Sequence, residues 1–225
     1  MKRLALLLLL PLLLAGCQKT YEFHVRRTVT VDTPQGEVQG STVLKVKFLH
    51  SYGRLVVPDA RGFGGVVAQG EATVVDLGDG RYLFALLGNE SAQLREAHRA
   101  AWDAAKKGND NWIPRWMAAL KQQTTPRPVP PEYYPLLVTF DDLTDPASVK
   151  RVDPADLAAT FGAGYALKGI TLEITDAPVT EGVVEGVLGW LGEYPEPGLC
   201  PSTGRTSNIP FCRKVHHGDI LRRAK

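Results

Sequence analysis

The chain has 225 residues, of which 44% are hydrophobic and 22% are charged. Because 26 basic residues nearly balance 24 acidic ones, the net charge of +2 provides no global field that would favour binding to nucleic acid. The length is sufficient for one sizeable core or two small ones, and we expect one compact unit with two lobes.

The first sixteen residues predict an export signal. Lys2 and Arg3 precede an uninterrupted apolar run, 4–14, which is followed by small residues. These eleven residues reach only about half of a hydrocarbon core roughly 30 Å thick, and Pro11 would kink their helix, so no permanent membrane span is expected. Removal of residues 1–16 would take away two of the 26 basic residues and no acidic one, leaving 24 of each in the remaining 209 residues.

The end of this segment carries a second signal. The sequence Leu14-Ala15-Gly16-Cys17 resembles the lipobox of bacterial lipoproteins, which implies cleavage before Cys17 and attachment of diacylglycerol to its thiol. Two or more acyl chains hold a protein stably on a bilayer. In lipoproteins of Gram-negative bacteria an Asp after this cysteine tends to mean retention in the inner membrane, whereas Gln18 resembles the outer-membrane case. We therefore expect the lipid bilayer as a partner, through acylated Cys17, with the domain facing the periplasm.

Residues 17–124 are expected to form an anchored N-terminal α+β lobe. Alternation of apolar and polar residues predicts strands, and a period of three to four residues predicts helices. In chain order the patterns predict a hairpin (21–31 and 44–48, with a turn at 33–36), a glycine-rich loop (51–65), more apolar strands (74–77 and 82–87) and helices (91–108 and from Pro114).

Five prolines in 125–135 predict a stiff connector to a C-terminal α+β lobe at 136–199. This lobe is expected to contain a strand (136–140), a helix (154–161), strands on either side of a β-bulge at Gly169, and a helix (179–191). Gly182, Gly186 and Gly189 in the last helix suggest close backbone packing against a neighbour. The predicted fold class is α+β, a mainly antiparallel sheet with helices packed on one side, in two lobes.

The C-terminal lobe contains four short motifs: Phe140-Asp141-Asp142-Leu143, Asp145-Pro146, Phe161-Gly162 and Ile170-Thr171-Leu172-Glu173-Ile174-Thr175. With these motifs the lobe resembles uncharacterised exported proteins of Gram-negative bacteria. The resemblance covers about a quarter of the chain, from about Pro135 to Leu191, and implies a fold unit without a known activity.

Residues 200–225 are expected to be a disulfide-closed loop and a basic tail. In an oxidising compartment Cys200 and Cys212 are expected to form a disulfide, whereas a zinc site with His216 and His217 is the alternative. The tail from Arg213 onward is expected to be solvated, with contact to anionic headgroups as the alternative.

A cluster of aspartates provides the main candidate for a metal site. Asp141, Asp142 and Asp145, with Asp153 and Asp156 nearby, could offer oxygens to calcium, but their spacing matches no EF-hand loop. Aspartates before prolines and near helix starts are ordinary turn and capping residues, which is the reading we favour. No cofactor is therefore expected.

Two further features have a structural and a functional reading. His98 is expected to be a packed histidine of the first helix rather than a base, since no nucleophile motif accompanies it. Trp112, Trp116, Tyr133 and Tyr134 are expected to pack in the core and connector, with an aromatic platform for a glycan or a proline-rich peptide as the alternative.

These observations favour a membrane-anchored envelope lipoprotein that acts as a non-catalytic binding or structural module, with an envelope protein or a glycan as its partner and no nucleic acid. The alternative is a metal-dependent envelope enzyme that uses the acidic turn around Asp141. The sequence has no G-x-S-x-G, H-E-x-x-H or P-loop motif, so catalysis is not the favoured interpretation.

Overall fold

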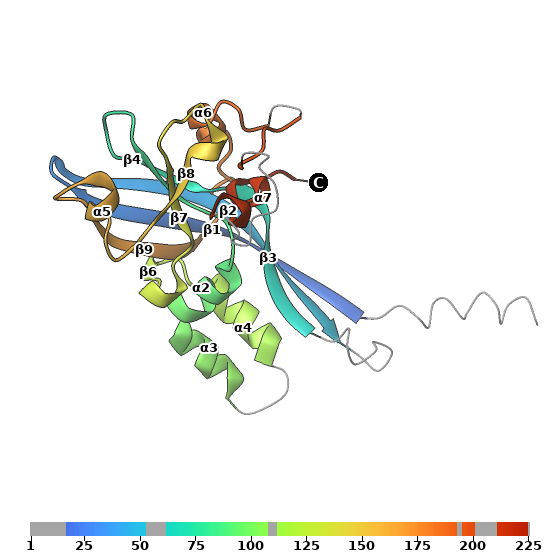
Figure 1. The fold of residues 1–225 in the computed structure, drawn as a ribbon. Coiled ribbons are helices and arrows are strands. Elements are labelled where there is room, and N and C mark those ends of the chain that lie inside the picture. The colour runs from blue at the N-terminus through green and yellow to red at the C-terminus, as the bar shows by residue number, and fades with distance from the viewer. Residues whose placement is uncertain (1–16, 53–61, 108–111, 193–194, 201–210, 225) are drawn as a thin grey trace, which may run out of the picture.

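The computed structural model describes residues 17–52, 62–107, 112–192, 195–200 and 211–224. It has an α+β fold rich in antiparallel sheet (Figure 1). The first sheet has the order β10-β3-β2-β1-β9-β6, formed by β1 (Cys17–Thr33), β2 (Gly36–Tyr52), β3 (Gly62–Glu71), β6 (Arg127–Pro128), β9 (Ala166–Thr175) and β10 (Leu221–Arg222). The second has the order β4-β5-β7-β8, formed by β4 (Thr73–Asp76), β5 (Tyr82–Ala85), β7 (Leu137–Phe140) and β8 (Val149–Val152).

The predicted first hairpin is confirmed and is longer than the sequence pattern indicated. β1 and β2 each span 17 residues and stay in register from Thr33, opposite Gly36, to Cys17, opposite Tyr52. Residues 51 and 52 belong to β2 and residues 62–65 belong to β3, so these parts of the expected loop are strand, whereas 53–61 lie outside the described residues. The open end of the unit formed by β1, β2 and β3 projects beyond the rest of the domain (Figure 1).

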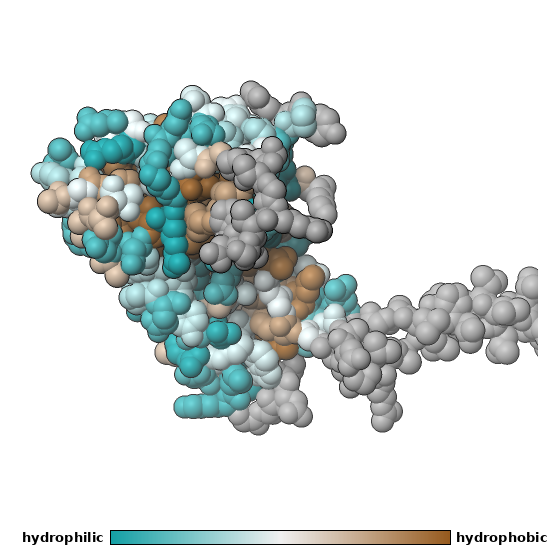
Figure 2. Space-filling model, viewed as in Figure 1, coloured by the Kyte–Doolittle hydropathy of each residue, from teal (hydrophilic) through white to brown (hydrophobic). Residues whose placement is uncertain are grey.

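The projecting end exposes apolar side chains. Leu49 and Tyr52 of β2 are 38% and 42% exposed, and Val66 of β3 is 52% exposed. Hydrophobic surface covers part of β3 on the face seen in Figure 2. The first residue of β1, Cys17, pairs with Tyr52, so the expected anchor point lies at the same end as these apolar groups.

The predicted β-bulge in β9 is confirmed. Thr30 of β1 lies opposite Gly169, while the next residue, Val31, lies opposite Leu167, so Lys168 is the extra residue. The bulge shifts the alternation by one position. Ile170, Leu172 and Ile174 beyond it are therefore buried on one face.

Each sheet takes strands from both sides of the expected connector at 125–135. β9 and β6 pair beside β1 in the first sheet, and β7 pairs with β5 in the second. The two sheets are therefore not two consecutive lobes of the sequence. The connector itself contributes β6 and a 3-10 turn, Pro131–Tyr133.

The helices form two groups. α2 (Glu90–Ala97), α3 (Arg99–Lys106) and α4 (Trp112–Lys121) lie together on one side of the first sheet (Figure 1), and their apolar residues join the first core cluster. α6 (Val183–Val187) and α7 (His217–Ile220) contribute Val184 and Ile220 to a second cluster with Phe84 and Phe140. α5 (Ala158–Phe161) is a single turn that begins four residues later than expected.

Two helix predictions are wrong in their lengths. The helix expected over 91–108 is interrupted at His98, whose φ of −114° and ψ of 36° separate α2 from α3. The helix expected over 179–191 is reduced to α6 because Gly182 has a φ of 85°, outside the helical region. A Cβ built on Gly182, Gly186 or Gly189 would meet nothing within 4 Å, so these glycines do not serve close backbone packing.

The C-terminal segment is partly buried and not a solvated tail. Val215 and Ile220 are 3% and 0% exposed, and β10 pairs with β3. The amide of Ala72 donates to the carbonyl of Ile220 at 2.7 Å. The predicted disulfide between Cys200 and Cys212 is confirmed.

A buried arginine joins the two sheets. Arg27 of β1 is 0% exposed and donates to Thr73 Oγ1 of β4 at 2.8 Å and to the carbonyl oxygens of Ala85 and Leu86 at 2.7 and 3.0 Å. Its guanidinium also lies 3.4 Å from the buried carboxylate of Glu90, at the start of α2. Burial lowers the pKa of Arg27, and the carboxylate of Glu90 opposes that shift. The guanidinium of Arg27 therefore connects β1 with β4, β5 and α2.

Candidate functional site

The first half of β1 has an open edge. β9 pairs with β1 only from Asp32 to His24, because β9 ends at Thr175. β1 continues for seven residues beyond this point, to Cys17. In the described part of the chain no strand pairs with residues 17–23 on that side, while β2 covers the other side along the whole strand.

The hydrogen bonds of β9 show which residues of β1 face this open edge. The amide of Ile174 donates to the carbonyl of Gln123 at 2.8 Å, so Ile174 turns its backbone groups away from β1. Thr175 therefore turns toward β1, where His24 is its partner. Because strand residues alternate in direction, every second residue before His24 directs its N–H and C=O groups to the open edge. These residues are Glu22, Thr20 and Gln18.

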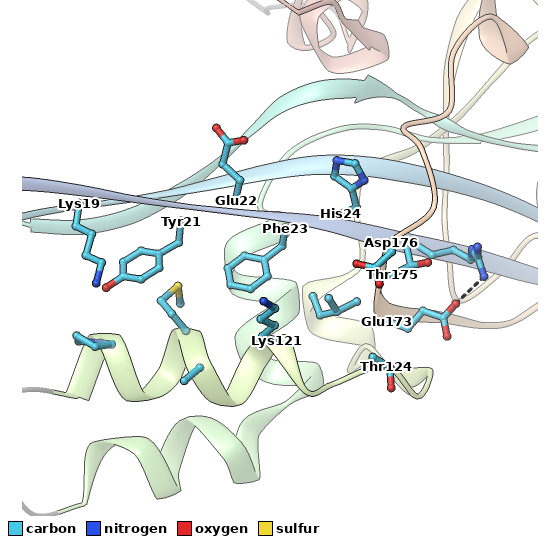
Figure 3. Close-up of a pocket in the computed structure, with 15 residues that line it drawn as sticks. Lys19, Tyr21, Glu22, Phe23, His24, Lys121, Thr124, Glu173, Thr175 and Asp176 are labelled. Atoms are coloured by element: carbon cyan, nitrogen blue, oxygen red, sulfur yellow. Dashed lines mark hydrogen bonds and ion pairs between the residues drawn. The ribbon is translucent and has the colours of Figure 1, made fainter.

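Helix α4 lies alongside this edge, and a groove of about 990 Å³ separates them. Figure 3 shows Tyr21 and Phe23 pointing from β1 toward α4, while Glu22 and His24 point away from it. The apolar lining is formed by Tyr21, Phe23, Pro114, Met117, Ala118 and Ile174. We call this space the β1–α4 groove. Its volume is that of a typical ligand site. Of the three residues at the open edge, Glu22 lines the groove, whereas Gln18 and Thr20 lie beside it on the same strand.

Two lysines extend into the groove without an acidic partner. Lys19 lies over the ring of Tyr21, 5.0 Å from its centre, and Lys121 reaches up from α4 toward Phe23 (Figure 3). Neither lysine makes an ion pair with any residue that the structure describes. Asp176, which also lines the groove, likewise has no ion pair within the described residues, so the unpaired charges of the groove are two cations and one anion.

Two of the three carboxylates that line the groove are already neutralised by other cations. Glu22 lies 2.9 Å from Lys45 Nζ and 3.0 Å from Lys47 Nζ, and the hydrogen bonds from these lysines lower the pKa of Glu22. Glu173 lies 2.9 Å from Arg26. His24 Nδ1 is hydrogen-bonded to the carbonyl of Ala177 at 2.7 Å, which holds the segment after β9 beside the groove.

The aspartates considered as candidates for a metal site make local contacts. Asp142 accepts hydrogen bonds from the amide and hydroxyl of Thr144 at 2.8 and 2.7 Å, and these bonds lower its pKa. Asp145 accepts from the amide of Ala147 at 2.9 Å, and Asp141 pairs with Lys150. Among the described residues, no three His, Cys, Asp or Glu side chains lie close enough together to hold a metal ion.

The more distant aspartates have the same kind of role. Asp153 accepts from the amide of Ala155 at 2.9 Å, and Asp156 accepts from the amide of Ala159, in α5, at 3.0 Å. These are the turn and capping bonds that the sequence indicated.

The cysteines and histidines considered for zinc have other partners. Because Cys200 and Cys212 are oxidised to a disulfide, they offer no thiolate ligands. His216 Nδ1 lies 3.2 Å from Asp219, and His217 Nε2 is bonded to the carbonyl of Pro197 at 3.0 Å. The structure therefore separates this set into a disulfide and two local contacts.

The candidate aromatic platform is packed into the first core cluster. Trp116 is 1% exposed, and its ring meets that of Trp102 edge-on at 5.4 Å. Trp112 packs edge-on against Trp102 and Phe63, and Tyr133 and Tyr134 pack against the same cluster. These rings form a core layer between α3, α4 and β3, as the structural reading predicted.

His98 is a buried histidine at the junction of α2 and α3. It is 4% exposed, and neither ring nitrogen has a hydrogen-bond partner within the described residues. Burial lowers its pKa to about 4, and the positive charge of Arg127 adds to this shift. The neutral ring is therefore the form that the fold accommodates.

His98 should make the domain sensitive to acid. Because its folded pKa of about 4 lies below the ordinary histidine value of 6.5, the unfolded chain binds the proton more tightly. The resulting stability is fully present above pH 6.5 and is lost as pH falls toward 4. We expect about 1–2 kcal/mol to be lost at pH 5 relative to pH 7.5, measured by urea unfolding. His98→Phe should remove this part of the pH dependence. If that variant lost as much stability between pH 7.5 and pH 5, groups other than His98 would cause the loss.

The sequence did not single out the residues of the β1–α4 groove. Lys19, Tyr21, Phe23, Met117 and Lys121 were each consistent with an ordinary hairpin or an ordinary helix. The groove exists because β9 stops opposite His24, whereas β1 extends seven residues farther, to Cys17. This is a difference in length between two strands that are distant in the sequence. No local pattern contains that information.

No helix in the described ranges is both long and apolar enough to cross a bilayer. Comparison with known proteins gives no match: no family model, no curated protein and no solved structure is significantly similar to this chain.

Proposed function

We propose that the chain is a membrane-anchored lipoprotein of the cell envelope and acts as a non-catalytic binding module through the β1–α4 groove. The observation that carries this proposal is the groove itself, where an unpaired strand edge adjoins a space lined by apolar side chains and two lysines without ion pairs. Such a combination of an apolar lining and a few polar groups is typical of ligand sites.

The position of the groove fits a lipid anchor at Cys17. Acylated Cys17 would be the first residue of β1, and Lys19, two residues later, already lines the groove. Leu49 and Tyr52 are exposed at the same end, and aromatic and apolar groups are favourable at a bilayer interface. We propose that this end faces the bilayer, as part of a domain held on the periplasmic side of the outer membrane.

The alternative of a metal-dependent enzyme at Asp141 has weaker support. Asp141, Asp142 and Asp145 each already have a cation or backbone amide as a partner. Within the described residues these carboxylates are not gathered in a group that could hold a metal ion, so calcium binding would require the turn to rearrange. A binding role for the groove requires no such rearrangement.

The anchor is tested by fractionation of cells that produce the full chain. We expect the native protein in the outer-membrane fraction, sensitive to globomycin, and the Cys17→Ser variant outside that fraction.

The binding role is tested by placing a photo-crosslinking amino acid at Ala118, in the groove, or at Ala159, a matched exposed alanine on α5. A discrete adduct from Ala118 and none from Ala159 is expected. Equal labelling at both positions, or none at Ala118, would contradict the proposal.

A further inference from the structure

We propose that the β1–α4 groove binds an extended acidic segment of another protein, which adds to the first sheet as a strand beside residues 18–23 of β1. This inference rests on the proposed function, because it names the class of ligand for the same groove. It depends on three properties of the groove: its unpaired backbone groups, its apolar wall and the sign of its charge.

The backbone of β1 already has the form of a strand that lacks one neighbour. Gln18, Thr20 and Glu22 direct their N–H and C=O groups to the open edge, as the alternation from His24 requires. An added segment would continue the position that β9 occupies farther along the sheet. Six residues of an antiparallel strand span about 20 Å, so a short extended peptide can satisfy the whole edge. Addition of a strand to an open sheet edge is a general mode of peptide recognition.

The side chains of such a segment would alternate between two environments. Residues opposite Tyr21 and Phe23 would face α4, because directly opposed residues of paired strands lie on the same face. There they would meet Met117 and Ala118. The residues between them would face the side of Glu22 and His24, away from α4 (Figure 3). The groove therefore favours an apolar residue at the central position that faces α4.

The charge of the groove selects acidic residues at the two ends. Lys19 and Lys121 both line the groove on the face toward α4, and in the described chain neither has an acidic partner. Of the lining carboxylates, Glu22 and Glu173 are already paired with cations, whereas Asp176, just after β9, is not. The two unpaired lysines therefore outnumber one unpaired carboxylate. Acidic side chains on either side of an apolar one would match this pattern. An acyl chain would leave both the lysines and the backbone edge without partners.

The ligand class is tested with a capped peptide of the sequence Thr-Glu-Thr-Val-Thr-Glu-Thr and the full, processed protein in detergent micelles. In the inferred register the threonine amides face β1, while the Glu and Val side chains face α4. We expect a dissociation constant below about 1 mM by fluorescence anisotropy. N-methylation of the threonines should weaken binding at least tenfold more than N-methylation of the Glu and Val residues. A peptide with Lys in place of Glu should not bind measurably.

Two protein variants test the backbone edge of β1 and the charge of the groove separately. Thr20→Pro removes an edge N–H, which an edge strand tolerates, and should weaken binding at least tenfold. Lys121→Glu should weaken it about fivefold to tenfold, with a smaller difference in 1 M salt. Lys214→Glu makes the same charge change at an exposed position outside the groove and should leave binding unchanged. Retention of the native thermal transition is required of each variant. If Thr20→Pro does not keep the native transition, the proposal is tested by Lys121→Glu and by amide exchange of the unsubstituted protein.

Amide exchange gives a readout that does not depend on a variant. In the free protein the amides of Thr20 and Glu22 should exchange faster than that of Tyr21, which faces β2. The peptide should slow exchange at Thr20 and Glu22 in particular. Equal exchange at all three positions would contradict the assignment of the open edge.

Failure of this inference can be distinguished from failure of the proposed function. Absence of peptide binding at 1 mM, or equal effects of both N-methylation patterns, would overturn strand addition. If Ala118 then still gave a specific adduct with a lipid, a glycan or a second copy of the chain, the groove would remain a binding site with a different occupant. If Ala118 gave no specific adduct, the binding role itself would fail.

Discussion

Replacement of Arg27 by Ala should lower the free energy of unfolding by about 3–5 kcal/mol. The change would leave the carboxylate of Glu90 buried without its cation and the carbonyl groups of Ala85 and Leu86 without their arginine donor. It would also remove the bond to Thr73 and create a cavity where the side chain is now fully buried. Urea unfolding at pH 7.5, followed by far-ultraviolet circular dichroism, measures the effect.

Arg26 provides a matched control in the adjacent position of β1. Its side chain is 39% exposed, and its ion pair with Glu173 lies at the edge of the groove. Exposed pairs of this kind typically contribute less than about 1 kcal/mol, so Arg26→Ala should change stability little. A similar loss in both variants would mean that charge on β1, rather than the buried contact between sheets, determines stability.

Gly40→Ala should destabilise the domain by about 3 kcal/mol. Gly40 lies in β2 where this strand passes close to β4, and a Cβ at this position would overlap the carbonyl oxygen of Val74. It would also lie 2.7 Å from the carbonyl carbon of Val74, so backbone and not a flexible side chain would have to move. Because both strands belong to paired sheets, the shift would disturb hydrogen bonds in each. Thermal and urea unfolding give the measurement.

Gly64→Ala is the corresponding control in β3. A Cβ built on Gly64 would meet nothing within 4 Å, and its φ is not positive. The substitution should leave stability unchanged or raise it by a few tenths of a kcal/mol, because alanine restricts the unfolded chain. If Gly64→Ala were as destabilising as Gly40→Ala, the close approach of β2 and β4 would not explain the effect.

Several local features of the fold could be predicted because each depends on a short stretch of sequence. The alternation on either side of 33–36 gave the first hairpin, and the change of phase at Gly169 gave the bulge. Pairing of Cys200 with Cys212 followed from the number of cysteines left after Cys17. In each case the deciding residues are neighbours or a small set with few possible pairings.

Other features depended on contacts that local patterns do not contain. The apolar period continues through His98, yet the helix breaks there, and the ring is buried beside a second helix. Gly182 looked like part of a helical stripe, but it adopts a left-handed conformation before α6. The basic C-terminal segment appeared solvated because its charges are local, whereas the buried Ile220 packs against the second core cluster.

The candidate site illustrates the same distinction. Asp142, Asp145, Asp153 and Asp156 are close in sequence and make the turn and capping bonds that their spacing indicated, whereas Asp141 pairs with Lys150. The groove combines residues of β1 and α4 that lie about a hundred positions apart. Its open edge is defined by where β9 stops, so its prediction requires the pairing of strands and not their individual patterns.

The interleaved order of strands constrains how the chain can fold as it is made. The first three strands of the large sheet are synthesised early, but β9 joins them only after residue 175 and β10 only after residue 222. Long-range pairing of this kind is slow, since distant segments must meet before their contacts stabilise them. The large sheet can therefore be completed only after nearly all of the chain has been translated.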